Sequence, residues 1–518
     1  MQRTDTYGAE KETRLEQMAK EQYELIAGRF SNYDGFLSLL RVKNYIRHST
    51  KNNRNLFSFK GQQLGYFIFP FLIDMMLRHS RWELENGKII DESELGWLID
   101  KYINYPNMSM LKYTQEELNK FVPEELIRMS FEQFPLQEST RTIFPRYMFL
   151  YKIIPESDEK YRSYFKMISR VLDDDFELSL AEVFRCATGI SAAATIGDTI
   201  NENPKCEVDW LNEYVKSGKW SKVLNRLTIP ISKYKEEEGN GSIEKYLNKK
   251  YLDYSINWYP IIETKHGSVA PYPRLIMERV TKRLYKDFYN YYDEPSGNDK
   301  QLKLFMTLYG DIFEEYIGIL LRDSYGAENV FNFRDLPQVK GKRADWLVVH
   351  GRDLIVFECK AKRWPRKLKI TGSLQILESF LNKHIGLAVE QCLSSFQYLQ
   401  KNDSLSSSAS RYNYVILIED SFGFSNALDS LLEKNEVAGK LNNTNGQIMS
   451  LHELEILVSS NMCNNVESVF IKKLEDSSYR EASFDNYFTT LKGFEMRGDS
   501  ILDETFRDLF ELPNSWCQ

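Results

Sequence analysis

The spacing of apolar residues changes along the chain and divides it into two parts. Residues 12–48 and 64–103 carry apolar residues about 3.6 positions apart, and a helix-like pattern continues through 160–200, as in helices that bury one face. Residues 302–326 show the same spacing and end at a glycine, which favours the end of a helix. After them, short apolar runs rich in β-branched residues predict strands. We therefore expect a mainly helical region followed by an α/β domain.

The order of elements after residue 302 predicts the fold of the second part. It is helix, strand, strand, strand, helix, strand, at residues 302–326, 329–333, 346–349, 354–357, 387–401 and 412–420. This order predicts a mixed sheet flanked by helices.

Polar stretches suggest where the chain divides. Two of them, at 235–242 and 293–300, combine Gly or Pro with charged residues, and a third, at 402–410, is rich in serine; such stretches are typical of linkers and surface loops. We expect residues 1–292 to form a mainly helical region that serves recognition, a partner or oligomerisation. Residues 300–518 should form the α/β domain and a C-terminal extension.

Composition excludes some classes of protein. The 518 residues are 42% hydrophobic and 27% charged, as in soluble globular proteins. The longest apolar run, 64–77, contains Asp74 and is shorter than the ~20 residues that span a bilayer. The N-terminus is polar, and the six cysteines form no CxxC pair or cluster. We therefore expect a reduced, cytoplasmic protein without a membrane segment.

The segment ADWLVVHGRDLIVFECK, residues 344–360, reads as two apolar strands joined by a turn. A turn centred between Gly351 and Arg352 pairs Leu347 with Val356, and the same register places Asp345 opposite Glu358. Side chains directly opposite one another in an antiparallel pair have Cβ atoms about 4.5–5.5 Å apart. The two carboxylates should therefore meet at the end of the hairpin, whereas a turn of odd length would change this pairing.

Alternation along the second strand adds a lysine to the two carboxylates. Glu358 and Lys360 share one face, while Cys359 points to the other and should be a core residue. Two adjacent carboxylates repel one another, so one takes a proton or a cation lies between them. Carboxylate oxygens suit Mg²⁺, and a bound metal activates water and stabilises charge on phosphate. The pattern predicts metal-assisted phosphodiester hydrolysis, with Lys360 contacting the water or the phosphate.

The motif resembles that of the PD-(D/E)XK nuclease superfamily. Asp345 is followed by twelve residues and then by Glu358-Cys359-Lys360 at the end of an apolar strand. Over residues 302–420 the order of elements is also similar to that family's restriction endonuclease-like core. The chain has Ala344 where the literal motif has proline.

The resemblance implies further site residues and a cofactor. It implies an acidic residue on the preceding helix, for which Glu314 and Glu315 are candidates and Glu314 is preferred. It implies a polar residue on the following helix, for which Gln391 is the candidate. The implied cofactor is Mg²⁺ or Mn²⁺, held by Asp345, Glu358 and Glu314.

Positive charge gathers around the motif. Residues 338–369 hold ten basic and three acidic residues, in a chain whose formal net charge is -7. A basic loop beside paired carboxylates is where a phosphate backbone would lie. We expect nucleic acid, and DNA in particular, to be bound by residues Lys342, Arg343, Lys362, Arg363, Arg366, Lys367 and Lys369.

Two other segments carry a similar motif in a less suitable context. Glu263-Thr264-Lys265 has Asp253 upstream, but Pro260 within its apolar run argues against a central strand. The charged stretch around Asp158-Glu159-Lys160 has no strand before it. We therefore favour residues 345–360 as the site.

Other interpretations remain open at this point. Glu358 and Lys360 could form a structural ion pair, and Glu314 and Glu315 could be the solvated face of a helix. The protein could retain a nuclease-like fold and bind nucleic acid without cutting it. Alternatively, residues 1–292 could carry the function, with the C-terminal domain regulating it.

The architecture suggests a biological role by analogy only. A nuclease domain attached to a large helical region resembles bacterial restriction or anti-phage defence effectors. The chain contains no GxxxxGK[ST] motif, so an ATPase would be a separate defence-system protein. A homo-oligomer is the other partner that we expect.

Overall fold

The computed structural model describes most of the chain. The described ranges, some with short internal gaps, are 17–49, 56–65, 68–82, 87–110, 123–131, 139–204, 208–239, 254–293, 300–336, 343–401, 411–462, 467–476 and 479–512. The serine-rich loop expected at 402–410 and residues 240–242 and 294–299 of the two expected linkers lie outside them. Residues 235–239, expected as part of a linker, instead form the end of helix α12 (Ile231–Gly239).

The chain forms two compact units, and both are discontinuous in sequence. One comprises Met1–Val122 and Leu172–Asp287, and the other comprises Pro123–Val171 and Phe288–Gln518. The expected division at 293–300 lies close to the last of these boundaries, but it leaves out the segment Pro123–Val171, which packs with the C-terminal residues. The assignment of 300–518 as a nuclease-like domain stays a prediction.

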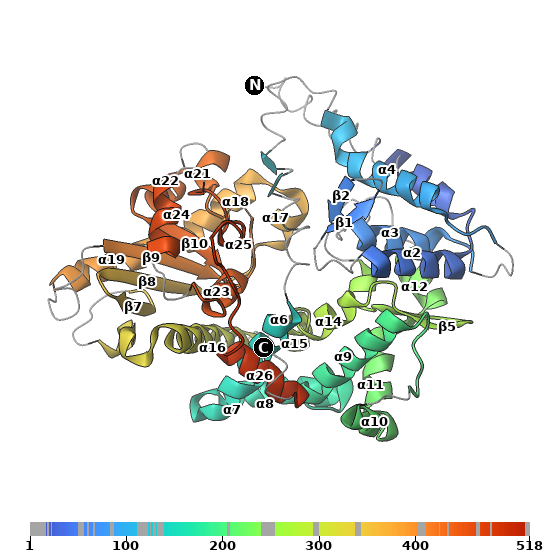
Figure 1. Cartoon of the computed structure of the whole chain (residues 1–518), viewed down its shortest axis with the longest axis horizontal. Coiled ribbons are helices and arrows are strands. Elements are labelled where there is room, and N and C mark those ends of the chain that lie inside the picture. Colours follow the sequence, from blue (N-terminus) through green and yellow to red (C-terminus); the bar gives the residue numbers. More distant parts are fainter. Residues whose placement is uncertain are drawn as a thin grey trace. The chain divides into compact units, whose positions relative to one another are not determined.

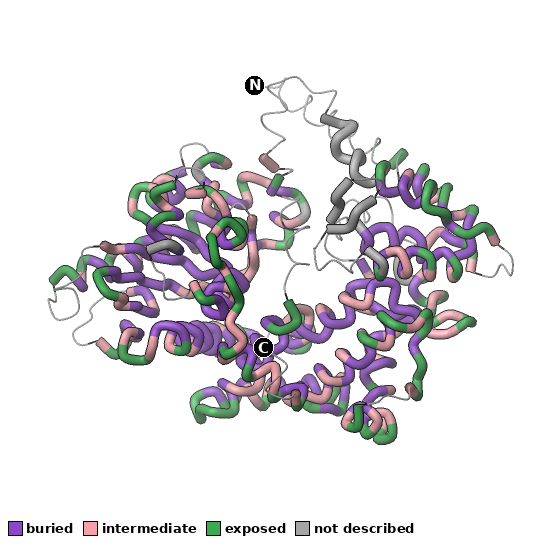
Figure 2. The backbone as a smooth tube through the Cα atoms, viewed as in Figure 1, coloured by how far each residue is buried: buried purple, intermediate pink, exposed green. Residues whose placement is uncertain are grey.

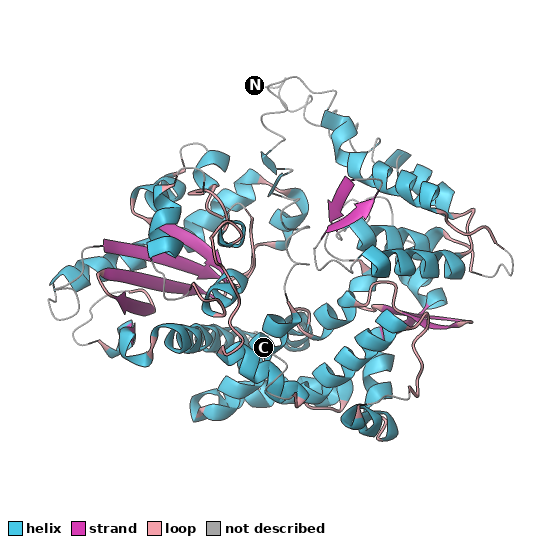
Figure 3. Cartoon of the chain, in the orientation of Figure 1, coloured by secondary structure: helices cyan, strands magenta, loops and turns pink. Residues whose placement is uncertain are grey.

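The first unit is mainly helical, as its apolar spacing predicts. Its helices are α2 (Gly35–Ser49), α3 (Ile68–His79), α4 (Glu92–Met110), α9 (Leu180–Ile196), α10 (Asp209–Lys216), α11 (Lys219–Leu227), α12 (Ile231–Gly239) and α14 (Arg274–Val280). Two more helices, α8 (Arg162–Phe176) and α15 (Leu284–Tyr292), run across the boundaries between units. Figure 3 shows that this unit consists mostly of helices.

Residues 69–77, the part of the apolar run at 64–77 whose side chains the structure describes, belong to the core of the first unit. Phe69 and Phe71 on α3 are buried, and they belong to a cluster of side chains from several elements of this unit. In the described part of the chain, no helix has the length and apolar character needed to cross a membrane. The run therefore packs inside the protein.

The first unit also contains strands that the apolar pattern does not predict. They form a hairpin of β1 (Leu56–Phe59) and β2 (Gln62–Gly65), and a small sheet in the order β3 (Thr228–Pro230), β4 (Ile261–Thr264) and β5 (Gly267–Val269). Each has only three or four residues, too few for alternation to be recognised.

The second unit is built on a mixed five-stranded sheet (Figures 1 and 3). Its order is β10 (Gly446–Ser450), β9 (Arg411–Ile418), β8 (Asp353–Lys360), β7 (Trp346–His350) and β6 (Val330–Asn332). Strands β8, β9 and β10 are parallel, whereas β6 and β7 pair antiparallel. The expected α/β domain with a mixed sheet is confirmed.

Helices flank this sheet. The longest are α16 (Lys300–Tyr325) and α19 (Gly386–Lys401). The others are α6 (Thr140–Met148), α7 (Ile154–Ser157), α17 (Arg366–Thr371), α18 (Leu374–Phe380), α21 (Leu428–Leu431), α22 (Glu436–Asn443), α23 (Leu451–Val458), α24 (Lys472–Glu475), α25 (Phe484–Phe488) and α26 (Ile501–Phe510), with π-helices η3 (Phe149–Ile153), η8 (Leu381–Ile385) and η9 (Glu467–Ile471).

The two long helices, α16 and α19, contact side chains that alternate along the central strands. Leu347 and Val356 cluster with Ala388 of α19. Trp346 points the other way, and its indole N–H donates to the main-chain oxygen of Glu314 on α16. A Cβ on Gly318 of α16 would lie only 2.2 Å from the Trp346 ring, so this glycine permits the close approach. Figure 2 shows the buried strands between the helices.

Candidate active site

The hairpin of β7 and β8 has the register that the sequence predicts. Its pairs run from His350 with Asp353 to Trp346 with Phe357 and include Leu347 with Val356. The two-residue turn begins at Gly351, whose φ is +59°, and glycine adopts this conformation without steric cost. The predicted pairing is therefore confirmed as far as residue 346.

The predicted pair of Asp345 with Glu358 is not part of the ladder, because Asp345 lies at a bend just before β7. Its charge nevertheless acts on Glu358. The Asp345 N–H donates to the main-chain oxygen of Phe357 at 3.1 Å. The Asp345 Oδ2 accepts the N–H of Cys359 at 2.7 Å. The carboxylate thus takes an amide of the strand that carries Glu358, and this bond fixes its orientation at the end of the hairpin.

Glu358 lies near the end of β8, between two neighbouring strands, and is only 1% exposed. Its Oε1 accepts a hydrogen bond from the Lys360 ammonium. Its Oε2 is buried and has no hydrogen-bond partner among the described residues. A buried carboxylate oxygen without a partner is costly, so this atom is suited to a bound cation.

Lys360 is held between two elements. Its Nζ donates to Glu358 and also to the Oε1 of Gln391 on α19, at 3.1 Å. The Nε2 of Gln391 in turn donates to the main-chain oxygen of Arg343 at 2.9 Å. Gln391 therefore connects Lys360 to the segment that leads into Asp345. Cys359, between the two motif residues, is half-buried and is not the fully buried core residue that alternation predicts.

The structure distinguishes the two candidate glutamates of α16. Glu314 is 8% exposed, and its oxygens accept from Arg334 at 2.5 Å and from Asn332 at 3.4 Å. Glu315 is half-exposed and lies 3.3 Å from Arg322. The charge of Glu314 acts on Glu358, and that of Asp345 acts on Glu314, so Glu314 is the glutamate that we place at the site.

The three carboxyl groups disfavour each other's ionisation. Burial, followed by the charge of Asp345, raises the pKa of Glu358 to about 8 and that of Glu314 to about 7. Burial also raises the pKa of Asp345, against the hydrogen bond from Cys359. Lys360 and Arg334 oppose these shifts without cancelling them. The cluster therefore favours a proton or a cation.

The donor set fits a metal that keeps several waters. Among the described residues, no group of three or more His, Cys, Asp or Glu side chains could hold a metal ion. Mg²⁺, however, commonly uses only one or two carboxylates and fills its other positions with water and substrate. Asp345 and Glu358 supply such a pair, and the unpartnered Oε2 belongs to it. Both oxygens of Glu314 already accept hydrogen bonds, so Glu314 as a ligand stays a prediction.

Two of the expected phosphate-binding residues are engaged with the protein itself. Arg363 forms an ion pair with Glu419, and Lys369 lies 2.6 Å from Asp420. These carboxylates directly follow β9 and lie outside residues 338–369. The count of basic and acidic residues over that range therefore omits them. Arg363 and Lys369 thus anchor the loop after β8 to the end of β9.

The other five candidates differ in exposure. Lys362, Arg366 and Lys367 are exposed. Arg343 is half-buried, with its guanidinium 4.0 Å from the centre of the Tyr398 ring. Lys342 lies outside the described residues. The exposed basic surface is therefore smaller than the sequence predicts.

Two basic residues near the site are absent from that prediction. Lys383 and His384 lie in η8, directly before α19, and His384 interacts electrostatically with Lys360 and Lys362. The sequence does contain a signal that could have identified them, because Lys383 and His384 are adjacent basic residues eight and seven positions before Gln391 on a continuous helix.

The first of the two rival motifs lies in a different setting. β4 begins directly after Pro260 and is the central strand of its small sheet, so the expectation against a central strand is wrong there. Proline immediately before a strand leaves its ladder intact. Glu263 is nevertheless exposed, and Asp253 lies outside the described residues.

The second rival is a solvated charged segment. Glu159 forms an exposed ion pair with Arg162, and Lys160 lies 3.3 Å from Asp311. All three motif residues are exposed, unlike the buried Glu358.

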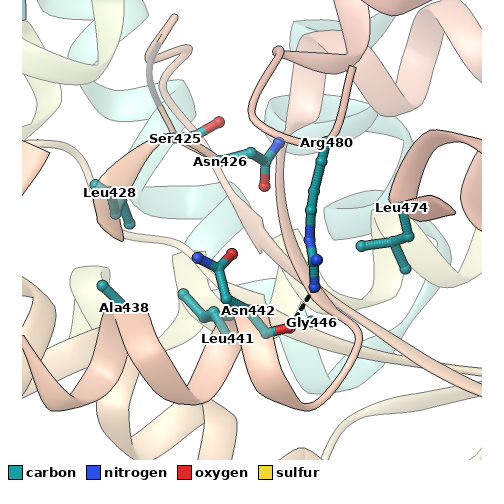
Figure 4. A pocket seen from close by; sticks show the side chains of 9 residues that line it. All are labelled: Ser425, Asn426, Leu428, Ala438, Leu441, Asn442, Gly446, Leu474 and Arg480. Carbon is teal, nitrogen blue, oxygen red and sulfur yellow. Dashed lines mark hydrogen bonds between the residues drawn. The ribbon is translucent and has the colours of Figure 1, made fainter. Parts of the chain in front are cut away.

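A small cavity in the same unit lies away from the motif residues. Figure 4 shows Arg480 beside it, donating to the main-chain oxygen of Asn442 at 2.6 Å. Its volume is about 10 Å³, enough for about one water molecule. Its lining contains none of the candidate site residues, and we interpret it as a packing defect.

Comparison of the chain with protein-family models, with curated proteins and with solved structures finds no match. A functional assignment therefore depends on the geometry of the site and on the topology that positions it.

Proposed function

We propose that the protein is a divalent-metal-dependent nuclease, with DNA as its substrate and endonucleolytic cleavage as its activity. The observation that carries the proposal is the buried, unpartnered Oε2 of Glu358 beside Asp345 and Lys360. A carboxylate pair next to a lysine on a central strand is expensive for folding alone. It is well suited to holding a cation against a phosphodiester.

The topology supports the restriction endonuclease-like fold as part of this proposal. The second unit presents α16, β6, β7, β8, α19 and β9 in this chain order, with the motif on β7 and β8. The order and the motif positions resemble those of the PD-(D/E)XK superfamily. Extra helices α17 and α18 and the parallel strand β10 are added to that arrangement.

Each side chain then has a role that follows from its contacts. Asp345 and Glu358 would hold Mg²⁺ or Mn²⁺, which supplies charge stabilisation and an acidified water when bound. An ammonium group has three N–H donors, and the bonds to Glu358 and Gln391 use two of those of Lys360. The third can donate to a phosphate oxygen or orient a water. Gln391 positions Lys360, and Glu314 adds negative charge behind the pair.

Plasmid cleavage tests the proposal. Purified protein should convert supercoiled DNA to nicked or linear forms with Mg²⁺ and should not do so with EDTA. Asp345→Asn and Lys360→Met should lower the rate by about 10²-fold or more, the usual effect of removing one preorganised charge. Glu315→Gln is the matched control, because Glu315 neighbours Glu314 but pairs outward with Arg322.

Cleavage that persists at the wild-type rate in both variants would reject these residues as the active site. The alternative function is nucleic-acid binding without cleavage, in a role such as sensing. It is favoured if calorimetry detects no uptake of Mg²⁺ or Mn²⁺ by a protein that still binds DNA. A role in restriction or anti-phage defence, with a separate partner protein or a homo-oligomer, is an analogy of architecture. Phage plating on cells with the wild-type and Asp345→Asn genes would test it.

A further inference from the structure

Lys383 and His384 belong to a π-helical turn that runs directly into α19. This turn, η8, covers Leu381–Ile385, and α19 begins at Gly386. His384 precedes Gln391 by seven residues, or about two helical turns, so both side chains lie on the same side of the helix. Because Gln391 bonds Lys360, this is the side that faces the candidate site. Single π-turns within helices frequently occur at functional sites.

Aromatic packing joins η8 to the loop that follows β8. The His384 ring lies 4.9 Å from that of Phe380, and Phe380 lies 4.6 Å from Trp364. Trp364 is buried, and its main-chain N–H donates to Asp420. Lys362 precedes Trp364 by two residues. The packing therefore holds the loop carrying Lys362 against the turn that carries Lys383 and His384.

The charges around His384 are positive. Burial lowers the pKa of His384, and Lys362, Lys383 and Lys360 lower it further. Lys362 and Lys383 are exposed and have no ion-pair partner among the described residues. In contrast, Arg363 and Lys369 are paired with carboxylates. Lys362 and Lys383 therefore offer positive charge next to His384 that no described carboxylate neutralises.

We infer that Lys362, Lys383 and His384 bind a backbone phosphate of the nucleic acid, adjacent to the phosphate that Lys360 contacts. This inference rests on the proposed function and adds the path of the substrate beside the site. Lysine ammonium groups and an imidazole N–H are the donors that such contacts use. The three side chains come from two elements held together by buried aromatic rings, so the subsite is formed before the substrate arrives.

Salt-dependent binding tests the inference without cleavage. The affinity of the Asp345→Asn protein for a labelled duplex, and for a single strand of the same sequence, is measured in EDTA over a range of KCl concentrations. Adding Lys383→Ala should lower the slope of log K against log salt by about 0.9 on duplex or about 0.7 on a single strand. Adding both Lys383→Ala and His384→Gln should weaken binding about tenfold at low salt. Adding Lys383→Arg alone, which keeps the positive charge, should leave binding as strong as in the Asp345→Asn protein.

The matched control is Lys401→Ala, because Lys401 is an exposed lysine at the far end of the same helix. It should change neither the affinity nor the slope. If Lys383→Ala behaves as Lys401→Ala does, the inference is overturned. The proposed function still stands in that case if the wild-type protein cleaves plasmid DNA. If binding depends on Lys383 but no cleavage occurs with Mg²⁺, the subsite is supported and the nuclease activity is rejected. Absence of binding to either nucleic acid overturns the inference.

Discussion

Two buried charge clusters lie on different sides of α16, and they differ in how completely their charges are matched. On one side, Tyr316 and Arg146 both bond Glu455. On the other, Glu314 faces Asp345 and Glu358. Both clusters are in the second unit, so they share one fold and one solvent environment, and only their chemistry differs.

In the first cluster every charge has its complement. The guanidinium of Arg146 donates from Nε and Nη2 to the two oxygens of Glu455, at 2.8 and 2.5 Å. The hydroxyl of Tyr316 adds a third bond at 2.8 Å. Arg146 is 3% exposed and Glu455 is fully buried. This is a structural ion pair, which joins α6 to α23 across α16.

In the second cluster negative charge is in excess. Three carboxyl groups face one ammonium and one guanidinium, and one oxygen of Glu358 is left without a hydrogen-bond partner in the described part of the protein. This difference shows that burial alone does not identify a functional charge. The informative feature is a buried charge whose compensation is incomplete.

The largest expected effect on stability comes from breaking the matched pair. Arg146→Met should lower the free energy of unfolding by about 3–5 kcal/mol, because it leaves the Glu455 carboxylate buried without its cation. Denaturant unfolding measures this loss. Arg146→Met combined with Glu455→Met should recover much of it. Glu358→Gln, measured in EDTA as the contrasting case, should leave stability unchanged or raise it. A large loss in Glu358→Gln would show that both clusters are structural.

A smaller effect should distinguish the unmatched cluster by its response to metal. Mg²⁺ at about 100 times its dissociation constant should stabilise the wild-type protein by about 2.7 kcal/mol, because only the folded state presents the carboxylate pair. Thermal unfolding with and without Mg²⁺ measures the shift. Asp345→Asn should remove it, while Tyr316→Phe should retain it. An equal shift in Asp345→Asn would place the metal elsewhere.

The metal-free protein should also lose stability as the pH rises. The pKa of Glu358 is raised from an ordinary 4.5 to about 8 in the folded state, so between these values the folded state binds more protons than the unfolded one. Stability therefore falls from pH 4.5 to 8. Over this range in EDTA, the free energy of unfolding of the wild-type protein should fall by at least about 1.4 kcal/mol more than that of Glu358→Gln. This difference is equivalent to one pKa unit. Parallel stability curves for the two proteins would contradict the expected repulsion.

The smallest effects concern single hydrogen bonds at the edges of the clusters. Tyr316→Phe should cost about 1–2 kcal/mol, because it removes one donor to a buried carboxylate that keeps its guanidinium. Glu315→Gln should change stability by less than about 0.5 kcal/mol, because its pair with Arg322 is half-exposed. Urea unfolding of the two variants compares them directly. Equal costs would indicate that Glu315 is more deeply involved than its exposure suggests.

The hairpin was predictable because its information is local. The two apolar runs at 346–349 and 354–357 and the glycine at 351 indicate the two strands, their pairing and the turn between them. The same is true of α16, α19 and β9, whose bounds lie within about two residues of the sequence expectation. Gln391 followed from the resemblance to a family, not from the residues alone.

Other features depend on residues far apart in sequence. Glu455 lies 309 residues after Arg146, and no pattern along the chain connects them. The carboxylates of Glu419 and Asp420 neutralise Arg363 and Lys369, although local charge counting assigned both basic residues to the substrate. Neither the membership of Pro123–Val171 in the second unit nor the position of Lys383 and His384 beside Lys360 follows from periodicity.

The sequence by itself determined the main elements of residues 302–420 and the pairing of residues 346–350 with 353–357, because backbone geometry repeats every few residues. Only the tertiary structure decided which charges are compensated. Compensation depends on which distant side chain fills the space beside a buried oxygen. For Glu455 that side chain is Arg146, whereas beside Glu358 Oε2 the described residues supply none.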